Sequence, residues 1–345
     1  MKAYAAIALQ LPARSVEYAA DPRAQMAAHI GEVATKLRSS AAFVQQYSGS
    51  PARLVVLPEY LFSSYPGQVS IPEFAANVAW AVDGAEYDAL GRVAQDRGLF
   101  LAGNAYETDV HFPGLYFQTS FVIAPSGDVV LRYRRLISMY APSPHDVWDK
   151  YLDIYGIDGV FPVAKTEIGN LAAIASEEIL YPEIARAHAL RGAEVFVHSS
   201  SEIGSPIKTP KMIAKQARAF ENMAYVVSAN TAGIIGTSGC AQSADGNSMV
   251  VDYKGAVLAE SNAGETFTAF ADIDIAALRG ARRKPGMTNV LSRQRTELFA
   301  STYAMGSHQC ANALIEGGVV KIPDRDHFNR VQVETLERLA KDGLI

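Results

Sequence analysis

Cysteine is scarce in this sequence. Only two thiols, Cys240 and Cys310, occur among 345 residues, which excludes the disulfide framework of a small secreted domain. A chain of this length can bury a large apolar core, so it needs neither disulfides nor a structural metal to hold it. We therefore expect a protein of a reducing compartment, the cytoplasm.

An excess of positive charge and long hydrophobic runs are also missing. The net charge is -5, and a protein without a basic surface cannot neutralise the phosphates of a nucleic acid. No apolar stretch approaches the ~18 residues that span a bilayer. The seven histidines are scattered without metal-ligand spacing, and no glycine-rich segment has the pattern of a phosphate-binding loop. We expect no nucleic acid, membrane, metal or cofactor as a partner.

Short apolar segments alternate with helical patterns along most of the chain. Strands are predicted at residues 3–11, 53–60, 99–107, 170–175, 193–200, 224–233 and 266–275, and hairpins at 118–136 and 247–261. Helices are predicted at residues 21–47, 85–98, 181–192 and 209–223. Near-continuous apolar strands of this kind are usually buried on both faces with helices outside them. The pattern predicts an α/β protein.

No internal repeat and no low-complexity linker divides the chain. We expect one domain over residues 1–300 and a C-terminal extension, 301–345, that contacts another copy of the protein. The segment 135–169 is rich in proline, aspartate, tyrosine and glycine. A connection of that length is uncommon in a compact domain and is usually functional, so this loop is expected to contribute to substrate selection.

Three polar residues follow apolar strands. Glu59 comes directly after a buried strand, where desolvation would raise its pKa towards the range of a general base. Arg135 ends a hairpin strand. Ser176 lies on an elbow between a strand and a helix, where free backbone N–H groups suit a developing oxyanion. Singly, each has a simpler interpretation: a surface carboxylate, a solvated arginine and a helix N-cap.

Together and in this order, the three segments resemble motifs of the nitrilase, or carbon–nitrogen hydrolase, superfamily. "LVVLPEYLF" is similar to the glutamate motif and places the base at Glu59. "GDVVLRYRRL" is similar to the lysine motif, with Arg135 at the lysine position. "IASEEILYPEIARAHALRGAEV" is similar to the cysteine motif, in which the nucleophile lies six residues before a Pro-Glu pair; that position is Ser176. The resemblance covers roughly residues 3–300, with further matches at 217–233 and 246–260.

The resemblance implies a four-layer αββα sandwich that pairs into an eight-layer dimer. It also implies hydrolysis of nitriles, amides or carbamoyl groups through a covalent thioester, without metal or cofactor. By analogy the backbone N–H of Glu177 would help to form the oxyanion hole, and Glu178 would support the elbow. Glu221 would be a supporting residue of the site, and Tyr60 would line the pocket or pack as a core aromatic.

The chain departs from the family pattern at two catalytic positions, which hold serine and arginine instead of cysteine and lysine. A serine hydroxyl is far less acidic than a thiol and needs an aligned base to attack. Arg135 could stabilise the oxyanion, clamp an anionic ligand, or lock Glu59 in an ion pair. The family's second glutamate has four candidate positions, His145, Asp146, Asp149 and Asp153. Cys240 could replace the missing thiol, although an ordinary loop residue is the simpler interpretation.

The sequence therefore favours a hydrolase of a C–N bond in a small amide or nitrile, with Ser176 in the nucleophile position. Two alternatives stay open. One is a non-catalytic protein that binds a carboxylate or another anion on the same fold. The other is an engineered Cys-to-Ser exchange that traps substrate in an active amidase or nitrilase. The expected partners are a small-molecule amide, nitrile or carboxylate and further copies of the chain, as a homodimer or a larger homo-oligomer.

Overall fold

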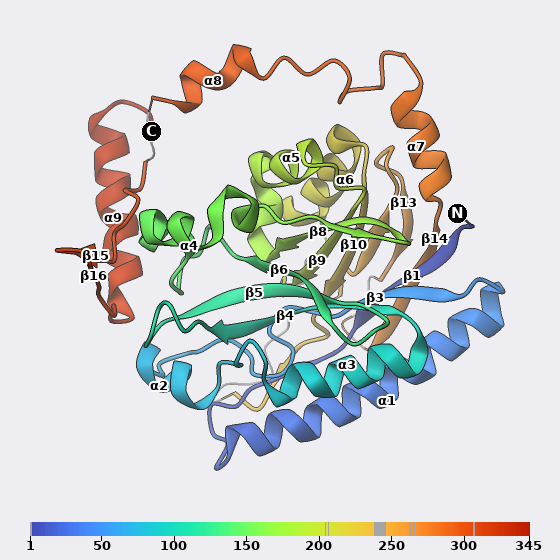
Figure 1. Ribbon diagram of the computed structural model, residues 1–345, viewed down its shortest axis with the longest axis horizontal. Coiled ribbons are helices and arrows are strands. Elements are labelled where there is room, and N and C mark those ends of the chain that lie inside the picture. The colour runs from blue at the N-terminus through green and yellow to red at the C-terminus, as the bar shows by residue number, and fades with distance from the viewer. Residues whose placement is uncertain are drawn as a thin grey trace.

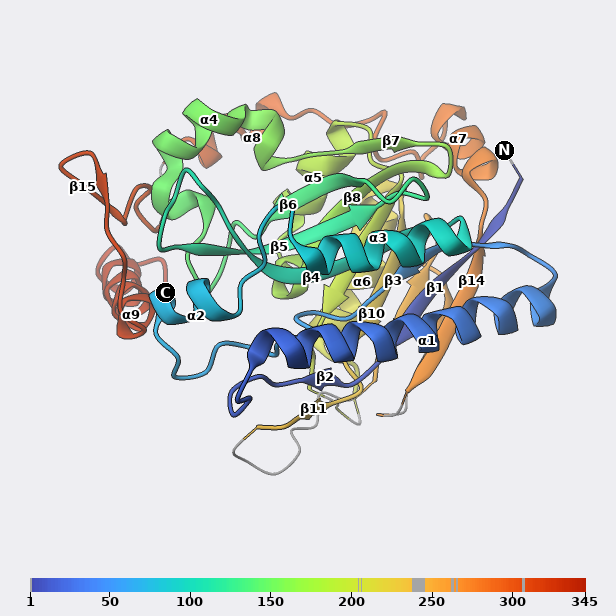
Figure 2. The same ribbon diagram turned by 60° about the horizontal axis from the view of Figure 1, so that its bottom comes forward.

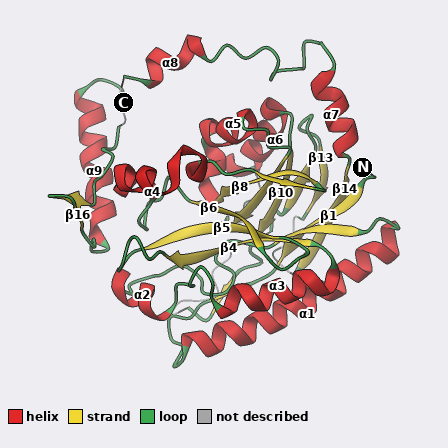
Figure 3. Ribbon diagram, in the orientation of Figure 1, coloured by secondary structure: helices red, strands yellow, loops and turns green. Residues whose placement is uncertain are grey.

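A computed structural model describes residues 2–203, 205, 207–237, 246–261, 264, 266–305 and 308–345. In this part of the chain two six-stranded sheets lie face to face, and helices cover their outer faces (Figure 1). Figure 3 shows these layers as strands enclosed by helices on both sides. The architecture is the expected α/β, four-layer αββα sandwich.

The first sheet has the strand order β14-β1-β3-β4-β5-β6. Strand β1 pairs in parallel with β3 and antiparallel with β14. The strands are β1 (Tyr4–Gln10), β3 (Ala52–Val56), β4 (Phe100–Thr108), β5 (Tyr116–Ile123), β6 (Val129–Arg134) and β14 (Phe267–Ile273).

The second sheet has the order β13-β12-β10-β9-β8-β7. Its central strands β8, β9 and β10 are parallel. The strands are β7 (Ala164–Thr166), β8 (Gly169–Ala175), β9 (Val195–Ser200), β10 (Tyr225–Asn230), β12 (Met249–Val251) and β13 (Val257–Glu260). A small separate pair consists of β2 (Ala13–Arg14) and β11 (Ile234–Ile235).

Helices α1 (Pro22–Ser48) and α3 (Ala85–Arg97) run beside each other over the first sheet (Figure 2). Helices α5 (Pro182–Leu190) and α6 (Pro210–Asn222) cover the second sheet. Side chains of β1 alternate between the two cores, as strand geometry requires. Ile7 and Leu9 pack with the residues of α1, whereas Ala6 and Ala8 pack with the second sheet. Small residues at this interface let the two sheets approach closely.

Each strand and helix predicted from the sequence is present, with ends that differ by a few residues. Helix α1 begins at Pro22 after Asp21, whose side chain accepts from the backbone N–H of Ala24. Helix α3 ends at Gly98 with φ 60°, a conformation that glycine adopts without the steric cost of a Cβ atom.

The prediction of a long loop at 135–169 was wrong. This segment forms a 3-10 turn (Pro144–Val147), helix α4 (Trp148–Val160) and strand β7. Gly156 has φ 62° and ψ 177°, so it breaks α4 into two short helical pieces. That break, with the prolines before it, obscures the helical periodicity in the sequence.

The C-terminal segment passes around the outer side of the layer that contains α5 and α6, through α7 (Ile275–Arg283), α8 (Glu297–Tyr303) and α9 (Asp326–Lys341) (Figure 1). It also carries the small hairpin β15 (Ile315–Glu316) and β16 (Val319–Val320). Arg325 attaches it to the half of the sandwich that contains the first sheet, by donating to the carbonyl of Val69 and to the hydroxyl of Tyr116 in β5, each at 2.7 Å. No helix in the described ranges is long and apolar enough to cross a membrane.

Candidate active site

Glu59 lies just beyond strand β3, at the edge where the two sheets meet. Its backbone N–H donates to the carbonyl of Ser200 at the end of β9, at 3.3 Å. The side chain is 2% exposed. Its Oε1 accepts from Gln118 Nε2 at 2.8 Å and lies 3.4 Å from Arg135 Nη1. Its Oε2 is buried and has no hydrogen-bond partner among the described residues.

The electrostatics of Glu59 suit a base. Burial raises its pKa above the ordinary value, while the nearby charges of Arg135 and Lys211 and the hydroxyl of Ser176 oppose that rise. A carboxylate with a raised pKa holds a proton more readily than an exposed one does. The carboxylate of Glu59 is thus a basic group that interacts with the Ser176 hydroxyl.

Arg135 follows strand β6 and is 7% exposed. Its Nε donates to the carbonyl of Ile137 at 2.8 Å, and its Nη1 donates to Gln118 Oε1 at 2.6 Å. Nη1 also contacts Glu59, and Nη2 forms an ion pair with Glu177. These contacts engage four of the five N–H groups of a guanidinium. Arg135 therefore holds Glu59 in position.

Ser176 forms the elbow after strand β8 and is 3% exposed. Its φ is 49°, a left-handed conformation that costs a residue with a Cβ atom roughly 1–3 kcal/mol. A short 3-10 turn, Ser176–Leu180, follows it, and α5 begins only at Pro182. The helix start expected directly after the elbow is thus a 3-10 turn. The strained backbone turns the hydroxyl away from the path of the strand.

The elbow is fixed by a buried histidine. His198 Nε2 lies 2.8 Å from the carbonyl oxygen of Ser176, and Nδ1 lies 2.8 Å from Ser228 Oγ. A carbonyl can only accept, so Nε2 carries the proton and Nδ1 accepts from Ser228. Burial lowers the pKa of His198 well below its ordinary value, in keeping with a neutral ring. His198 binds the backbone of the elbow and not its hydroxyl.

Glu178 connects the elbow to the first sheet. Its carboxylate accepts from the N–H groups of Leu136 (2.7 Å), Ile137 (3.0 Å) and Ala175 (3.3 Å) and from the Tyr133 hydroxyl (2.7 Å). The side chain is fully buried, and burial raises its pKa to about 7 although Arg135 and these donors oppose the rise. Through Glu178, the end of β6 and the end of β8 keep a fixed separation.

Lys211 is the second cation at the site. It lies in the first turn of α6, which Thr209 caps. Its Nζ donates to Ser176 Oγ at 3.3 Å. The side chain is partly exposed, so it reaches the serine from the side of the solvent. Three sequence-predicted residues, Glu59, Arg135 and Ser176, therefore meet around one point, together with a lysine that the motif analysis did not single out.

Two further candidates, Glu221 and Tyr60, lie around the three converging residues and have other contacts. Glu221 pairs with Arg218, whose Nε donates to the carbonyl of Ile179 in the 3-10 turn. Tyr60 follows Glu59 with φ 38° and contacts Tyr65 edge to face.

The four candidates for a second glutamate sit near α4. Asp146 accepts from Ser143, the backbone N–H of Asp149 donates to Asn312, and the ring of His145 contacts Trp148. Asp153 lies on α4 itself. Cys240 lies outside the described residues.

Three residues of the site were missed from the sequence. Gln118 is the first residue of a predicted apolar strand and lies inside the observed strand β5, so its polar side chain next to apolar residues was an available signal. His198 stands likewise in the apolar run "AEVFVHSS". Lys211 carries no such signal, because a lysine in the first turn of an amphipathic helix is indistinguishable from a solvated surface residue.

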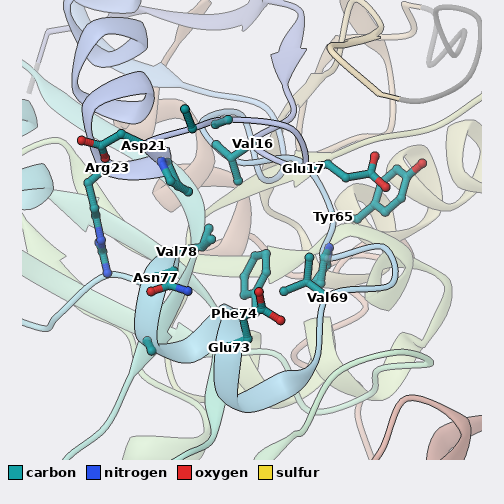
Figure 4. Close-up of a pocket in the computed structure, with 15 residues that line it drawn as sticks. Val16, Glu17, Asp21, Arg23, Tyr65, Val69, Glu73, Phe74, Asn77 and Val78 are labelled. Carbon is teal, nitrogen blue, oxygen red and sulfur yellow. The ribbon is translucent and has the colours of Figure 1, made fainter.

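No cluster of three or more His, Cys, Asp or Glu residues suited to a metal ion occurs in the described ranges. A separate pocket of about 550 Å³ lies between the segment before α1 and helix α2 (Ile71–Asn77) (Figure 4). Glu17, Asp21 and Glu73 line it, and Arg23 beside them is paired with Glu86. Its lining includes none of the three converging residues, so we assign it no catalytic role.

Comparison with known proteins identifies the family to which this arrangement belongs. The model of the carbon-nitrogen hydrolase family matches residues 17–283. The chain belongs to the carbon-nitrogen hydrolase family. Formamidase from Bradyrhizobium diazoefficiens is 28% identical over 68% of this chain and 64% of its own length. Omega-amidase NIT2 from Mus musculus is 24% identical over 76% of this chain and 90% of its own.

Solved structures of other carbon-nitrogen hydrolases share the fold. Saccharomyces cerevisiae Nit3, of the nitrilase superfamily, has a TM-score of 0.64 at 18% identity and covers 83% of this chain and 96% of its own. A cysteine-to-serine mutant of the amidase from Nesterenkonia sp. AN1 has a TM-score of 0.59 at 21% identity, over 87% of this chain and 97% of its own. At these identities the likeness concerns the αββα sandwich alone.

Proposed function

We propose that this carbon-nitrogen hydrolase cleaves the C–N bond of a small amide or nitrile with Ser176 as the nucleophile. The observation that carries the proposal is the buried carboxylate of Glu59, which interacts with the Ser176 hydroxyl and whose Oε2 has no hydrogen-bond partner among the described residues. A serine needs such an aligned base. The amidase names of the relatives, formamidase and omega-amidase, support an amide as the substrate.

Acylation of the serine would proceed in two steps. Ser176 Oγ attacks the carbonyl carbon of the amide while its proton moves to Glu59 Oε2, and the carbonyl oxygen becomes an oxyanion. The tetrahedral intermediate then breaks its C–N bond. Ammonia or an amine leaves with the proton from Glu59, and an acyl ester remains on Ser176.

Deacylation would use the same groups in reverse. Glu59 takes a proton from a water molecule, the hydroxide oxygen attacks the ester carbon, and Ser176 leaves with the proton that Glu59 returns. The product is a carboxylic acid. The backbone N–H of Glu177 is suited to the oxyanion because it follows the nucleophile in a tight turn, as in other oxyanion holes.

A non-catalytic anion-binding protein is the alternative on the same fold. An anion clamp would need free N–H groups on Arg135, whereas four of five already contact Glu59, Gln118, Glu177 and the carbonyl of Ile137. The surrounding carboxylates also repel a second anion. These contacts favour the hydrolase over the clamp.

The test of the proposal is ammonia release from a panel of small amides and nitriles. Turnover should fall by about 10³-fold or more in Ser176→Ala, because its nucleophile is gone. Ser39→Ala, an exposed serine on α1, is the matched control and should retain full activity. Trapping of the acyl group on Ser176 by rapid quench and intact-mass measurement would identify the ester.

Ser176→Cys separates the alternatives. A thiol ionises far more readily than a hydroxyl, so on a hydrolase scaffold this variant should match or exceed the wild-type rate. Activity only in the cysteine variant would mean that the serine itself blocks an otherwise complete site. Inactivity of both proteins, together with calorimetric binding of a carboxylate such as acetate, would contradict the hydrolase and support the binding protein.

We also propose that the protein works as a homodimer or larger homo-oligomer and that residues 301–345 contribute to the contact. Exposed apolar side chains on this segment support the idea, among them Tyr303, Met305 and Leu344. Light scattering on the full chain and on a chain truncated after residue 300 would test it. A monomeric full chain would contradict the proposal.

A further inference from the structure

Lys211 differs from every other cation of the site in what it contacts. Its Nζ donates to Ser176 Oγ at 3.3 Å, so it touches the atom that would react. Arg135, which occupies the family's lysine position, is instead turned towards Glu59, Gln118 and Glu177. The cation that donates to the hydroxyl therefore comes from helix α6 and not from the end of strand β6.

A neighbouring lysine on the same helix face shows the contrast. Lys215 lies one turn later and is fully buried. It donates to the carbonyl of Asn247 at 2.9 Å and lies 3.5 Å from Glu202, so its charge is used within the fold. Lys211 is partly exposed, and an ammonium has three N–H groups. Within the described part of the chain its Nζ has one hydrogen bond, to the serine, so it keeps donors for a substrate.

We infer that Lys211 is a catalytic residue that stabilises negative charge on Ser176 Oγ and on the oxyanion formed by its attack. This inference rests on the proposed serine chemistry. As the Ser176 proton moves to Glu59, negative charge develops on Oγ and then on the former carbonyl oxygen. An ammonium at hydrogen-bond distance from that centre interacts more strongly with the transition state than with the neutral serine, which is the condition for acceleration.

The two cations, Arg135 and Lys211, then have separate tasks. Arg135 orients the base and is saturated by it, while Lys211 stabilises the charge that develops on the nucleophile and substrate. In a serine site this second task is more demanding than in a cysteine site, since an alkoxide is far less stable than a thiolate. The lysine would thus compensate for the loss of the thiol.

The decisive measurement is the rate at which a fluorophosphonate modifies Ser176. In that reaction an Oγ–P bond forms, the P–F bond breaks, fluoride leaves, and the hydroxyl proton goes to Glu59. It needs an activated serine but no amide turnover. Intact mass and peptide mapping would give the rate for the wild type, Lys211→Met and Lys211→Arg, with Ser176→Ala as the blank.

We expect Lys211→Met to slow labelling by about 10²-fold, the usual effect of removing one oxyanion donor. Lys211→Arg keeps the charge and should lose less. Lys208→Met removes an exposed lysine three residues earlier and should leave the rate unchanged. Thermal unfolding of each variant would exclude a general loss of structure, which is not expected because Lys211 is partly exposed.

Equal labelling of wild type and Lys211→Met would overturn the inference, as would a wild type that does not react at all. In amide turnover, a lower kcat at unchanged KM supports it, whereas a raised KM at unchanged kcat would make Lys211 a binding residue and overturn it. A different result would contradict the proposed hydrolysis. A labelled, lysine-dependent Ser176 without turnover of any amide or nitrile would refute the hydrolase and leave the activated serine standing.

Discussion

The end of β6 and the start of α6 each bring a cation to the same site, but in opposite ways. Arg135 is 7% exposed and directs four N–H groups at protein acceptors. Lys211 is partly exposed and has, among the residues that the structure describes, one hydrogen bond, to Ser176 Oγ. A buried charge must be fully paired to be tolerated, whereas a charge at the edge of solvent can keep free donors. Burial thus decides which cation is structural and which can act on a substrate.

Removal of the buried cation should have the largest effect on stability. Arg135→Met leaves Glu59 and Glu177 without their counter-charge, so we expect the free energy of unfolding to fall by about 3–5 kcal/mol. Urea denaturation at pH 8 would measure the loss. It should be smaller at pH 5, because Glu59 has a raised pKa and its protonated form needs no cation.

The control for this variant is Arg14→Met. Arg14 pairs with Glu32 at 3.0 Å, but both side chains are at least one-third exposed. Surface pairs of this kind contribute about 0–1 kcal/mol. If the two substitutions destabilised the protein equally, the network around Arg135 would not be the buried, mutually dependent structure described here.

Much of the fold and part of the site could be anticipated from the sequence, because the signals for them are local. Glu59, Arg135 and Ser176 each follow an apolar strand, so the tip of the strand fixes where they lie. The α/β class likewise follows from continuous apolar strands between amphipathic helices, whereas the four-layer arrangement was implied by the family resemblance. The helix in 135–169 was missed because a non-helical Gly156 interrupts its periodicity.

Lys211 could not be predicted for a different reason. Its position depends on how α6 packs across the second sheet, which no local pattern specifies. The pairing of Arg135 with Gln118 and Glu177 has the same origin. The backbone elements of the site could therefore be read from the chain, whereas the task of each cation required the relative placement of three separate segments.

A substitution that keeps the positive charge at residue 135 should destabilise the protein less than Arg135→Met does. Arg135→Lys introduces the residue that the family resemblance would place here, but one ammonium cannot reach Glu59, Gln118, Glu177 and the carbonyl of Ile137 together. We expect a loss of about 2 kcal/mol in unfolding free energy, the cost of a charged hydrogen bond left unmade. Urea denaturation would measure it. Unchanged stability would mean that the planar fork of arginine is dispensable.

Lys211→Met should also shift the pH dependence of kcat/KM, and this shift is expected to be small. Lys211 lowers the pKa of Glu59, against the rise caused by burial. Removal of that charge in Lys211→Met raises the pKa further. Glu59 must be a carboxylate to accept the serine proton, so the acid limb of kcat/KM for an amide should move to higher pH.

The Lys208→Met control isolates this electrostatic contribution. Lys208 is exposed, and the field of a solvated charge is screened by salt. Its removal should therefore leave the acid limb of kcat/KM at the same pH. Two results would mean that the lysine does not act on the base. The acid limb of Lys211→Met could move to lower pH, or it could lie at the same pH as the acid limb of Lys208→Met. Lys211 would then differ from Arg135 only in its exposure, and the separation of tasks between the two cations would fail.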